Sequence, residues 1–165
     1  MATATRIDLE AFVASEYPRV VAAVRLTTGD HDAAPDAVQD ALVGLIANPP
    51  RREPDNIAAY ITVVATNKLR DVQRRRGAEQ RALGRMPSPR EDVADELSAL
   101  DLDVAAAIRA LPERQRDICI LHYLMDHSVD TIAGALGVST GTVKTQLHRA
   151  RASLAAALGK EASDD

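Results

Sequence analysis

Apolar residues recur at three- and four-residue spacings along most of the chain, and this is the period of amphipathic helices. In the N-terminal half the pattern predicts a first helix that carries Phe12 and Val24 and breaks near Gly29, a second over residues 36–46 and a long third over residues 57–76. No segment shows the alternation of apolar and polar residues that is typical of strands. The sequence therefore predicts an all-α fold.

Two of these helices carry polar faces opposite their apolar ones. In the second helix Asp36, Gln39 and Asp40 lie at i, i+3 and i+4, and we name these three residues the acidic stripe. The acidic stripe is either a docking surface or a solvated face without a partner. In the long helix the side expected to be buried carries Tyr60, Ile61, Val64, Ala65, Leu69 and Val72. The side expected to be exposed carries Asn67, Arg70, Asp71, Arg74 and Arg75, and there Asp71 can pair with Arg74 or Arg75.

A second group of helices is predicted after residue 100, and its turn residues indicate a helix-turn-helix. Pro112 suits the first position of a helix with apolar residues at 118, 121, 124 and 125. Ser128 can cap the next helix, and Gly137 can end it in a left-handed conformation. Ser139 can then cap a third helix directly after a short turn. This arrangement is typical of DNA-binding proteins that place the third helix in the major groove.

The third helix is expected to bury Val143, Leu147, Ala150 and Leu154. Its opposite face and start are polar and basic, and they carry Ser139, Thr140, Thr142, Lys144, Thr145, His148, Arg149 and Arg151. A basic helix face alone is usually only solvated, but the preceding helix and turn favour DNA binding here. If Ser139 caps the helix, we expect the residues nearest the groove to be Thr142, Lys144, Thr145 and His148. Arg149 and Arg151 lie further along the helix and are expected to reach phosphates.

Between residues 77 and 99 the chain turns polar and carries Gly84, Pro87 and Pro89, which indicates a flexible linker. We therefore predict two small helical domains, 1–76 and 100–158, joined by this linker and followed by a tail over 159–165. The alternative is a surface loop within one domain.

Charge is strongly segregated along the chain, although the net charge is only -4. Residues 68–90 hold eight basic and two acidic residues, whereas residues 91–103 hold six acidic residues and no basic one. This pattern predicts a basic patch for phosphates beside an acidic segment that repels DNA or engages a basic partner.

Composition and residue spacing argue against a membrane protein, a metal site and an enzyme. The chain has no apolar run of membrane-spanning length and no signal peptide, so we expect a cytoplasmic protein without membrane insertion. Its single cysteine, Cys119, lies in an apolar helix and reads as a buried structural thiol. The histidines lack metal-ligand spacing and no glycine-rich phosphate loop is present, so we expect no metal, no cofactor and no enzymatic activity.

Several segments resemble one known family. LPERQRDICILHY and IAGALGVSTGTVKTQLHRAR resemble the fourth conserved region of sigma-70-family RNA polymerase sigma factors. DAVQDAL resembles the second-region helix that docks on the polymerase, and AAYITVVATNKLRDVQRRR resembles the promoter-melting helix. The chain as a whole is similar to the small extracytoplasmic-function (ECF) sigma factors, which keep only the second and fourth regions.

The resemblance implies roles for the candidate residues. The acidic stripe would bind the beta and beta-prime subunits of the polymerase core, the helix-turn-helix would bind the minus-35 promoter element, and an anti-sigma factor is expected. The chain itself would carry no catalytic chemistry. The minus-10 element would be bound by the loop over 48–56, which captures an unstacked base, and by the long helix. The residues implied there are Asn48, Arg51, Arg52, Asn56, Tyr60, Asn67, Lys68, Arg70, Asp71, Arg74 and Arg75.

The chain departs from the family pattern at four positions. Tyr60 stands where the family usually has Trp, Val63 and Thr66 where it often has basic residues, and Gln146 where Arg is common. The alternative to a sigma factor is a helix-turn-helix regulator that binds a palindromic operator as a dimer, independently of polymerase.

Overall fold

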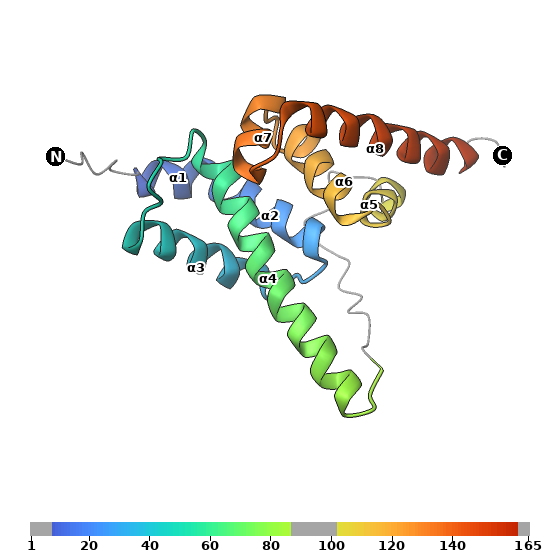
Figure 1. Cartoon of the computed structure of the whole chain (residues 1–165), viewed down its shortest axis with the longest axis horizontal. Coiled ribbons are helices and arrows are strands. Elements are labelled where there is room, and N and C mark those ends of the chain that lie inside the picture. The colour runs from blue at the N-terminus through green and yellow to red at the C-terminus, as the bar shows by residue number, and fades with distance from the viewer. Residues whose placement is uncertain (1–7, 87–101, 162–165) are drawn as a thin grey trace.

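The computed structural model describes residues 8–86 and 102–161, and these residues contain helices and no strand. The N-terminal unit, residues 8–86, consists of α1 (Leu9–Ser15), α2 (Tyr17–Thr28), α3 (Ala34–Ala47) and α4 (Ile57–Ala82). The C-terminal unit, residues 102–161, consists of α5 (Leu102–Arg109), α6 (Glu113–Cys119), the π-helix η1 (Ile120–Leu124), α7 (Val129–Leu136) and α8 (Thr140–Glu161). Figure 1 shows the two units side by side. The all-α prediction is confirmed for these residues.

The N-terminal unit is a bundle in which α2, α3 and α4 pack on one another. Its centre holds Val20, Val24, Val38 and Ile61, all fully buried. Helix α4 begins where the Asn56 side chain accepts a hydrogen bond from the Ala59 backbone N–H at 3.0 Å. This cap satisfies a donor that would otherwise lack a partner in the first turn.

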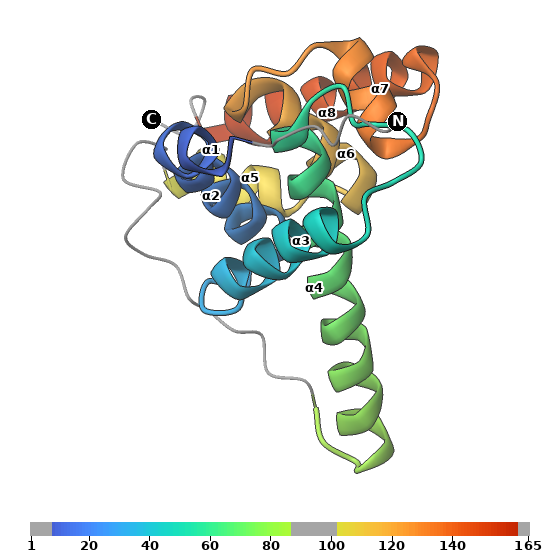
Figure 2. The ribbon, with the colours of Figure 1, turned by 90° about the vertical axis from the view of Figure 1, so that its left-hand side faces the viewer.

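Three details of this unit differ from the sequence prediction. The first predicted helix is two helices, α1 and α2, which meet at Glu16. Pro18 explains the break, because proline lacks the N–H that would continue the α1 ladder but suits the first turn of α2. Helix α4 continues to Ala82, beyond residue 76, and its last turns project away from the bundle (Figure 2). Val72, predicted to be buried, is 37% exposed near this projection.

The helix-turn-helix follows the predicted capping residues. Ser128 Oγ accepts a hydrogen bond from the Thr131 N–H, and Ser139 Oγ accepts one from the Thr142 N–H, each at 3.1 Å. Gly137 ends α7 with a φ of 66°, a left-handed conformation that favours glycine. The helix that precedes α7 is predicted as one α-helix, whereas it widens into the π-helix η1 after Cys119. The buried stripe of α8 is confirmed at Val143, Leu147 and Ala150, and Leu154 is partly buried.

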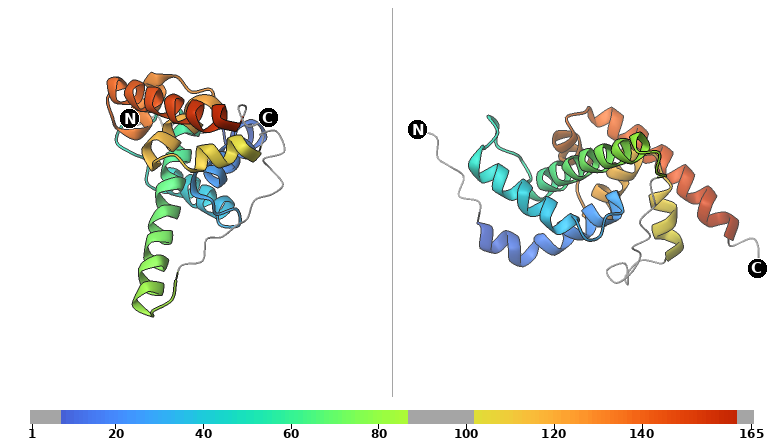
Figure 3. Two further views of the ribbon diagram at one scale, coloured as in Figure 1. Left: turned by 90° about the vertical axis from the view of Figure 1, so that its right-hand side faces the viewer. Right: turned by 90° about the horizontal axis from the view of Figure 1, so that it is seen from below.

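The two units are packed against each other. Helices α2 and α4 contact α6, η1 and α7, and one apolar cluster contains residues of both units, such as Val20 and Ile132. Figures 2 and 3 show the C-terminal unit lying against α2 and the first part of α4, while the last turns of α4 remain uncovered. The predicted linker over 77–99 overlaps α4 up to Ala82, and its part from residue 87 lies outside the described residues.

Candidate nucleic-acid interface

The acidic stripe lies on the exposed face of α3. Asp36, Gln39 and Asp40 are all exposed, and further along the same face Val43 and Ile46 are 64% and 54% exposed. These two apolar residues continue the stripe at helical spacing. They were not among the residues predicted from the sequence. Their spacing from Asp36, Gln39 and Asp40, which puts apolar residues on a polar helix face, could have identified them. The combined face offers both charge and apolar area to a partner.

The loop before α4 presents a largely exposed polar surface. Asn48, Arg51 and Arg52 are exposed, whereas Asn56 is half-buried and its side-chain oxygen is engaged in capping α4. Tyr60 is half-buried and packs against the apolar cluster. Between this loop and α7 lies a pocket of about 270 Å³, lined by Arg52, Glu53, Pro54, Asp55, Asn56, Tyr60, Thr131, Gly134 and Ala135. The candidate base-capturing loop therefore faces the C-terminal unit.

On α4, most of the candidate DNA-binding side chains are exposed as expected: Asn67, Lys68, Asp71, Arg74 and Arg75. Of the two partners predicted for Asp71, Arg74 forms the ion pair, with an N–O distance of 3.5 Å. Lys68 leans toward α3, with Nζ 3.5 Å from the Asp40 carbonyl oxygen. Arg70 differs, because it was predicted to be exposed and is only 7% exposed. The C-terminal unit covers it.

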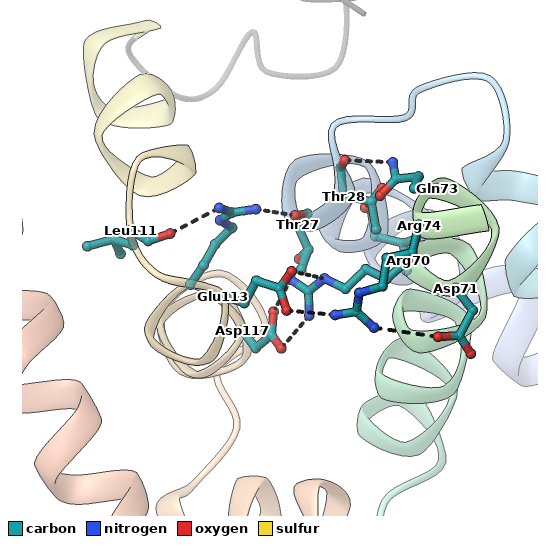
Figure 4. A network of polar contacts seen from close by, with 11 residues as sticks. Thr27, Thr28, Arg70, Asp71, Gln73, Arg74, Leu111, Glu113 and Asp117 are labelled. Atoms are coloured by element: carbon teal, nitrogen blue, oxygen red, sulfur yellow. Dashed lines mark hydrogen bonds and ion pairs between the residues drawn. The ribbon is translucent and has the colours of Figure 1, made fainter. Parts of the chain in front are cut away.

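Arg70 is held by two carboxylates of α6 (Figure 4). Its Nη1 and Nη2 donate to the two carboxylate oxygens of Asp117 at 2.8 and 2.7 Å, and Nε lies 4.0 Å from Glu113 Oε1. Burial works against the charged form of Arg70, but the hydrogen bonds and charge of Asp117 together outweigh it, so that the pKa of Arg70 is raised. Arg74 extends the network by donating to Glu113 Oε2 at 3.2 Å.

Further polar contacts join the units at the end of α2. Arg116 Nη1 donates to the Thr27 carbonyl at 2.9 Å, while its Nη2 donates to the Leu111 carbonyl at 3.0 Å. Burial, followed by the nearby charge of Arg70, lowers the pKa of Arg116. On another side of the interface Arg19 donates to the Leu124 carbonyl at 3.0 Å and lies 3.6 Å from Asp126. Neither Arg116 nor Arg19 belonged to a predicted site.

The face of α8 expected to meet DNA is free of the interface between the units. Thr140, Lys144, Thr145, His148, Arg149 and Arg151 are exposed, and Thr142 is half-buried. Ser139 and Thr142 hydroxyls are hydrogen-bonded to each other at 2.9 Å as part of the helix cap. Arg151 donates to the Tyr123 hydroxyl and lies over its ring, 5.6 Å from the centroid. Tyr123 lies on η1 and is 46% exposed, and it was not among the residues predicted from the sequence.

The thiol of Cys119 is buried and has a structural role. Cys119 is 1% exposed, and burial raises the pKa of its thiol, so it is a buried structural residue as predicted. Within 8–86 and 102–161 no cluster of three or more His, Cys, Asp or Glu side chains is arranged to hold a metal ion. No helix in these ranges is long and apolar enough to cross a membrane.

Comparison with known families covers both units. Residues 12–79 match the family model described as sigma-70 region 2, and residues 101–154 match the model described as sigma-70, region 4. The first match contains the loop, α3 and α4 as far as residue 79, and the second contains α7 and α8 as far as residue 154. Each candidate surface thus lies inside a matched region.

Individual relatives agree with these matches. The RNA polymerase sigma-E factor of Streptomyces coelicolor is 30% identical over 152 residues, covering 90% of this chain and 84% of that protein. The ECF RNA polymerase sigma factor SigM of Mycobacterium tuberculosis is 32% identical, covering 82% of this chain and 69% of that protein. The chain spans 58% of the length of the ECF sigma factor SigE of Mycolicibacterium smegmatis, to which it is 29% identical.

Two solved structures resemble the fold over most of the chain. The sigma factor RpoE from Bartonella quintana, crystallised with the anti-sigma factor NepR, superimposes with a TM-score of 0.75 at 28% identity, covering 92% of this chain and 97% of that one. CnrH, in complex with the cytosolic domain of CnrY, gives a TM-score of 0.65 at 25% identity, covering 92% of this chain and 87% of that chain.

Proposed function

The chain belongs to the sigma-70 family of RNA polymerase sigma factors, in its ECF group, and we propose that it directs polymerase to promoters as a non-catalytic specificity subunit. One observation carries this proposal: the two exposed basic or polar helix faces, on α4 and α8, lie in the two units that match regions 2 and 4. Two separate DNA-binding faces on one chain fit the recognition of two promoter elements.

The acidic stripe and the adjoining Val43 and Ile46 are the proposed docking face for the polymerase core. Their exposure and position on α3 leave them open to a partner on the side of the bundle away from α2 and α4. Apolar side chains flanked by carboxylates suit an interface with a buried centre and a charged rim.

The loop over 48–56 and α4 are the proposed minus-10 site. Arg51, Arg52 and Arg75 are exposed and can bind phosphates, and the aromatic ring of Tyr60 offers a surface for stacking. Extruding a base from a duplex costs a few kcal/mol, which contacts to the flipped base must offset. Arg70 can contribute to this site only when its ion pair with Asp117 is broken.

The exposed face of α8 is the proposed minus-35 site. Thr142, Lys144, Thr145 and His148 lie in its first turns, where helix-turn-helix proteins contact base edges. Arg149 and Arg151 lie further along and are placed for phosphates. Ser139 and Thr140 begin the helix, where N–H groups can also meet a phosphate.

An anti-sigma factor is a proposed partner, because both structural relatives were solved with one or with a partner's cytosolic domain. The proposed location is the cytoplasm, at the nucleoid, where polymerase works. No finding favours the alternative of an operator-binding dimer. The discriminating experiment is size-exclusion chromatography with purified core polymerase: a sigma factor co-elutes with the core, whereas the alternative regulator elutes alone.

A further inference from the structure

Arg151 of α8 is held by a side chain from another helix of the same unit. Its Nε donates to the Tyr123 hydroxyl, and its guanidinium lies over the Tyr123 ring, 5.6 Å from the centroid. Tyr123 belongs to η1, which continues α6, and α6 packs against α8 (Figure 1). The contact therefore joins residues 28 positions apart in the chain, beside the proposed minus-35 site.

We propose that Tyr123 is a positioning residue for DNA binding, which holds the Arg151 guanidinium in the orientation that binds a phosphate of duplex DNA. This inference rests on the proposed function, because it adds a residue to the minus-35 site described there. The added residue lies outside α7 and α8, which carry the helix-turn-helix.

The contact leaves the outer end of Arg151 available to a phosphate. A guanidinium carries five N–H donors, and the Tyr123 hydroxyl accepts the one on Nε. The four donors on Nη1 and Nη2 are not used in this contact, and two of them can bind two phosphate oxygens at once. The hydroxyl keeps its own hydrogen, which can donate to the same phosphate. Because Arg151 is exposed, DNA can approach this end.

Arg151 shares one side of α8 with candidate base-reading residues. Successive residues of an α-helix are rotated by about 100°, so Lys144, His148 and Arg151, at i, i+4 and i+7, form one row along α8. Arg149 is rotated by about 200° from Arg151 and lies on another side of the helix. Tyr123 therefore orders only one of the two arginines assigned to phosphates.

Tyr123 is itself supported by a neighbouring ring. The His122 ring meets the Tyr123 ring edge to face, with centroids 4.8 Å apart and ring planes at 78°. His122 Nδ1 lies 3.0 Å from the His127 carbonyl oxygen, and since a carbonyl only accepts, Nδ1 donates. A continuous series of contacts thus runs from a backbone carbonyl through His122 and Tyr123 to Arg151. This support lets Tyr123 hold Arg151 in one orientation.

The π-helix places Tyr123 on the outside of the unit. The Met125 N–H donates to the Ile120 carbonyl at 3.2 Å, five residues back, so this turn holds one residue more than an α-helical turn. Ile120, Leu121 and Met125 are buried, whereas Tyr123 is exposed beside α8. Single π-turns within α-helices frequently occur at functional sites, and here the turn carries the residue that contacts Arg151.

The expected benefit of the contact is entropic. An arginine side chain loses rotamer freedom when it binds a phosphate, and Arg151 has already lost much of this freedom in the folded chain. Ordering one such side chain in advance is expected to strengthen DNA binding about threefold to tenfold. The aromatic ring leaves the positive charge of Arg151 in place, so the attraction to phosphates is kept.

The test is a double-mutant cycle on the full-length chain, with a short duplex DNA of mixed sequence as the probe. Fluorescence anisotropy measures binding from low salt upward, because phosphate contacts are strongest at low salt. Tyr123→Leu removes the ring and the hydroxyl, whereas Tyr123→Phe removes only the hydroxyl. Arg151→Ala removes the positioned arginine, and Arg149→Ala removes the same charge from another side of α8 as the matched control.

We expect Tyr123→Leu to weaken DNA binding about threefold to tenfold in the wild-type chain and in Arg149→Ala, but not in Arg151→Ala. Tyr123→Phe should bind more tightly than Tyr123→Leu, since its ring still lies over the guanidinium. Arg151→Ala should reduce the slope of log affinity against log salt by about 0.9. Equal losses for Tyr123→Leu in the two arginine variants, or no loss in the wild-type chain, would overturn the positioning role.

Two further measurements keep the outcome unambiguous. Urea denaturation checks the fold of each variant, and if Tyr123→Leu does not fold, Tyr123→Phe is compared in the same two arginine variants. Co-elution with core polymerase is measured separately. A chain that co-elutes but shows no coupling between Tyr123 and Arg151 contradicts the positioning role and leaves the sigma-factor function intact. Coupling in a chain that elutes alone supports the positioning role and contradicts the sigma-factor function.

Discussion

Arg70 of α4 and Asp117 of α6, 47 positions apart in the chain, form a two-point ion pair with N–O distances of 2.8 and 2.7 Å. The pair joins the unit that matches sigma-70 region 2 to the unit that matches region 4. It places a residue implied in minus-10 binding inside the interface between the units. The face of α4 that binds DNA in the proposed function is thus also the face that contacts α6 of the C-terminal unit.

Reversal of one charge in the acidic stripe is expected to weaken association with the core. Asp40→Lys should lower the affinity for core polymerase by about tenfold or more, because like charges replace opposite ones across the proposed interface. The exposed position keeps the free energy of unfolding within about 0.5 kcal/mol of the wild type. Asp32→Lys, exposed before α3, makes the same charge change outside the stripe. Equal losses of core affinity in both variants would count against the stripe.

Residues of α8 should divide into base readers and phosphate anchors. Lys144→Ala is expected to relax the preference at one or two minus-35 positions, since a good contact to guanine contributes about 1 to 3 kcal/mol of discrimination. Arg149→Ala should instead weaken binding to all sequences about equally. A panel of single-base minus-35 variants bound by the holoenzyme measures both effects. An equal loss of affinity for all variants with Lys144→Ala would contradict base reading by Lys144 and indicate a phosphate contact instead.

Arg75 on α4 is expected to make one phosphate contact. Arg75→Ala should reduce the slope of log affinity against log salt by about 0.9 on duplex DNA or by about 0.7 on melted strands. Arg75 suits this test because its side chain is exposed and lies outside the ion pairs of α6. Arg114→Ala, an exposed change of the same charge on α6, should leave the slope unaltered. An unchanged slope for Arg75→Ala would show that Arg75 does not contact a phosphate.

The Ser128 cap should contribute measurably to stability. Ser128→Ala removes the acceptor for the Thr131 N–H and is expected to lower the free energy of unfolding by about 1 kcal/mol. Ser128→Asp keeps an acceptor at the N-terminus of α7 and should retain most of the wild-type stability. Urea denaturation followed by circular dichroism compares the three proteins. Equal midpoints for Ser128→Ala and the wild type would contradict a stabilising cap.

Acidification should destabilise the chain through His127. Burial lowers the pKa of His127 below its ordinary value of 6.5 in the folded chain. As the pH falls through about 6.5, His127 is therefore protonated in the unfolded chain before it is protonated in the folded chain, and stability is lost from there downward. Above that pH the His127 imidazole is neutral in both states, and it leaves stability unaffected. Denaturation midpoints across this range should fall less for His127→Gln than for the wild type. Parallel pH profiles would assign the loss to other groups.

Local signals in the sequence were sufficient for the caps and the turn of the helix-turn-helix. Ser128, Gly137 and Ser139 act through backbone groups only a few residues away, so their roles could be predicted from spacing alone. The Asp71–Arg74 pair is likewise a neighbour contact along one helix. The exposed face of α8 followed from the same helical period that placed Val143 and Leu147 inside.

Features that depend on distant partners could not be predicted in this way. Arg70 lies on the polar face of α4, and only the position of Asp117 on another helix makes that face buried there. Val72 follows the apolar period of α4 but remains exposed, because the helix outruns the bundle that would cover it. The widening of the helix into η1 could not be predicted either, because apolar residues at 118, 121, 124 and 125 fit the period of an ordinary α-helix.

Transcription by purified core polymerase tests the central claim most directly. Fragmented genomic DNA from the source organism is transcribed with core alone, with core plus the wild-type chain, and with core plus Asp40→Lys, and the 5′ ends of the RNA are sequenced. We predict a discrete set of start sites that appears only with the wild-type chain, shares two upstream sequence elements and weakens with Asp40→Lys. Start sites identical to those of core alone, together with separate elution of chain and core, would contradict a sigma factor.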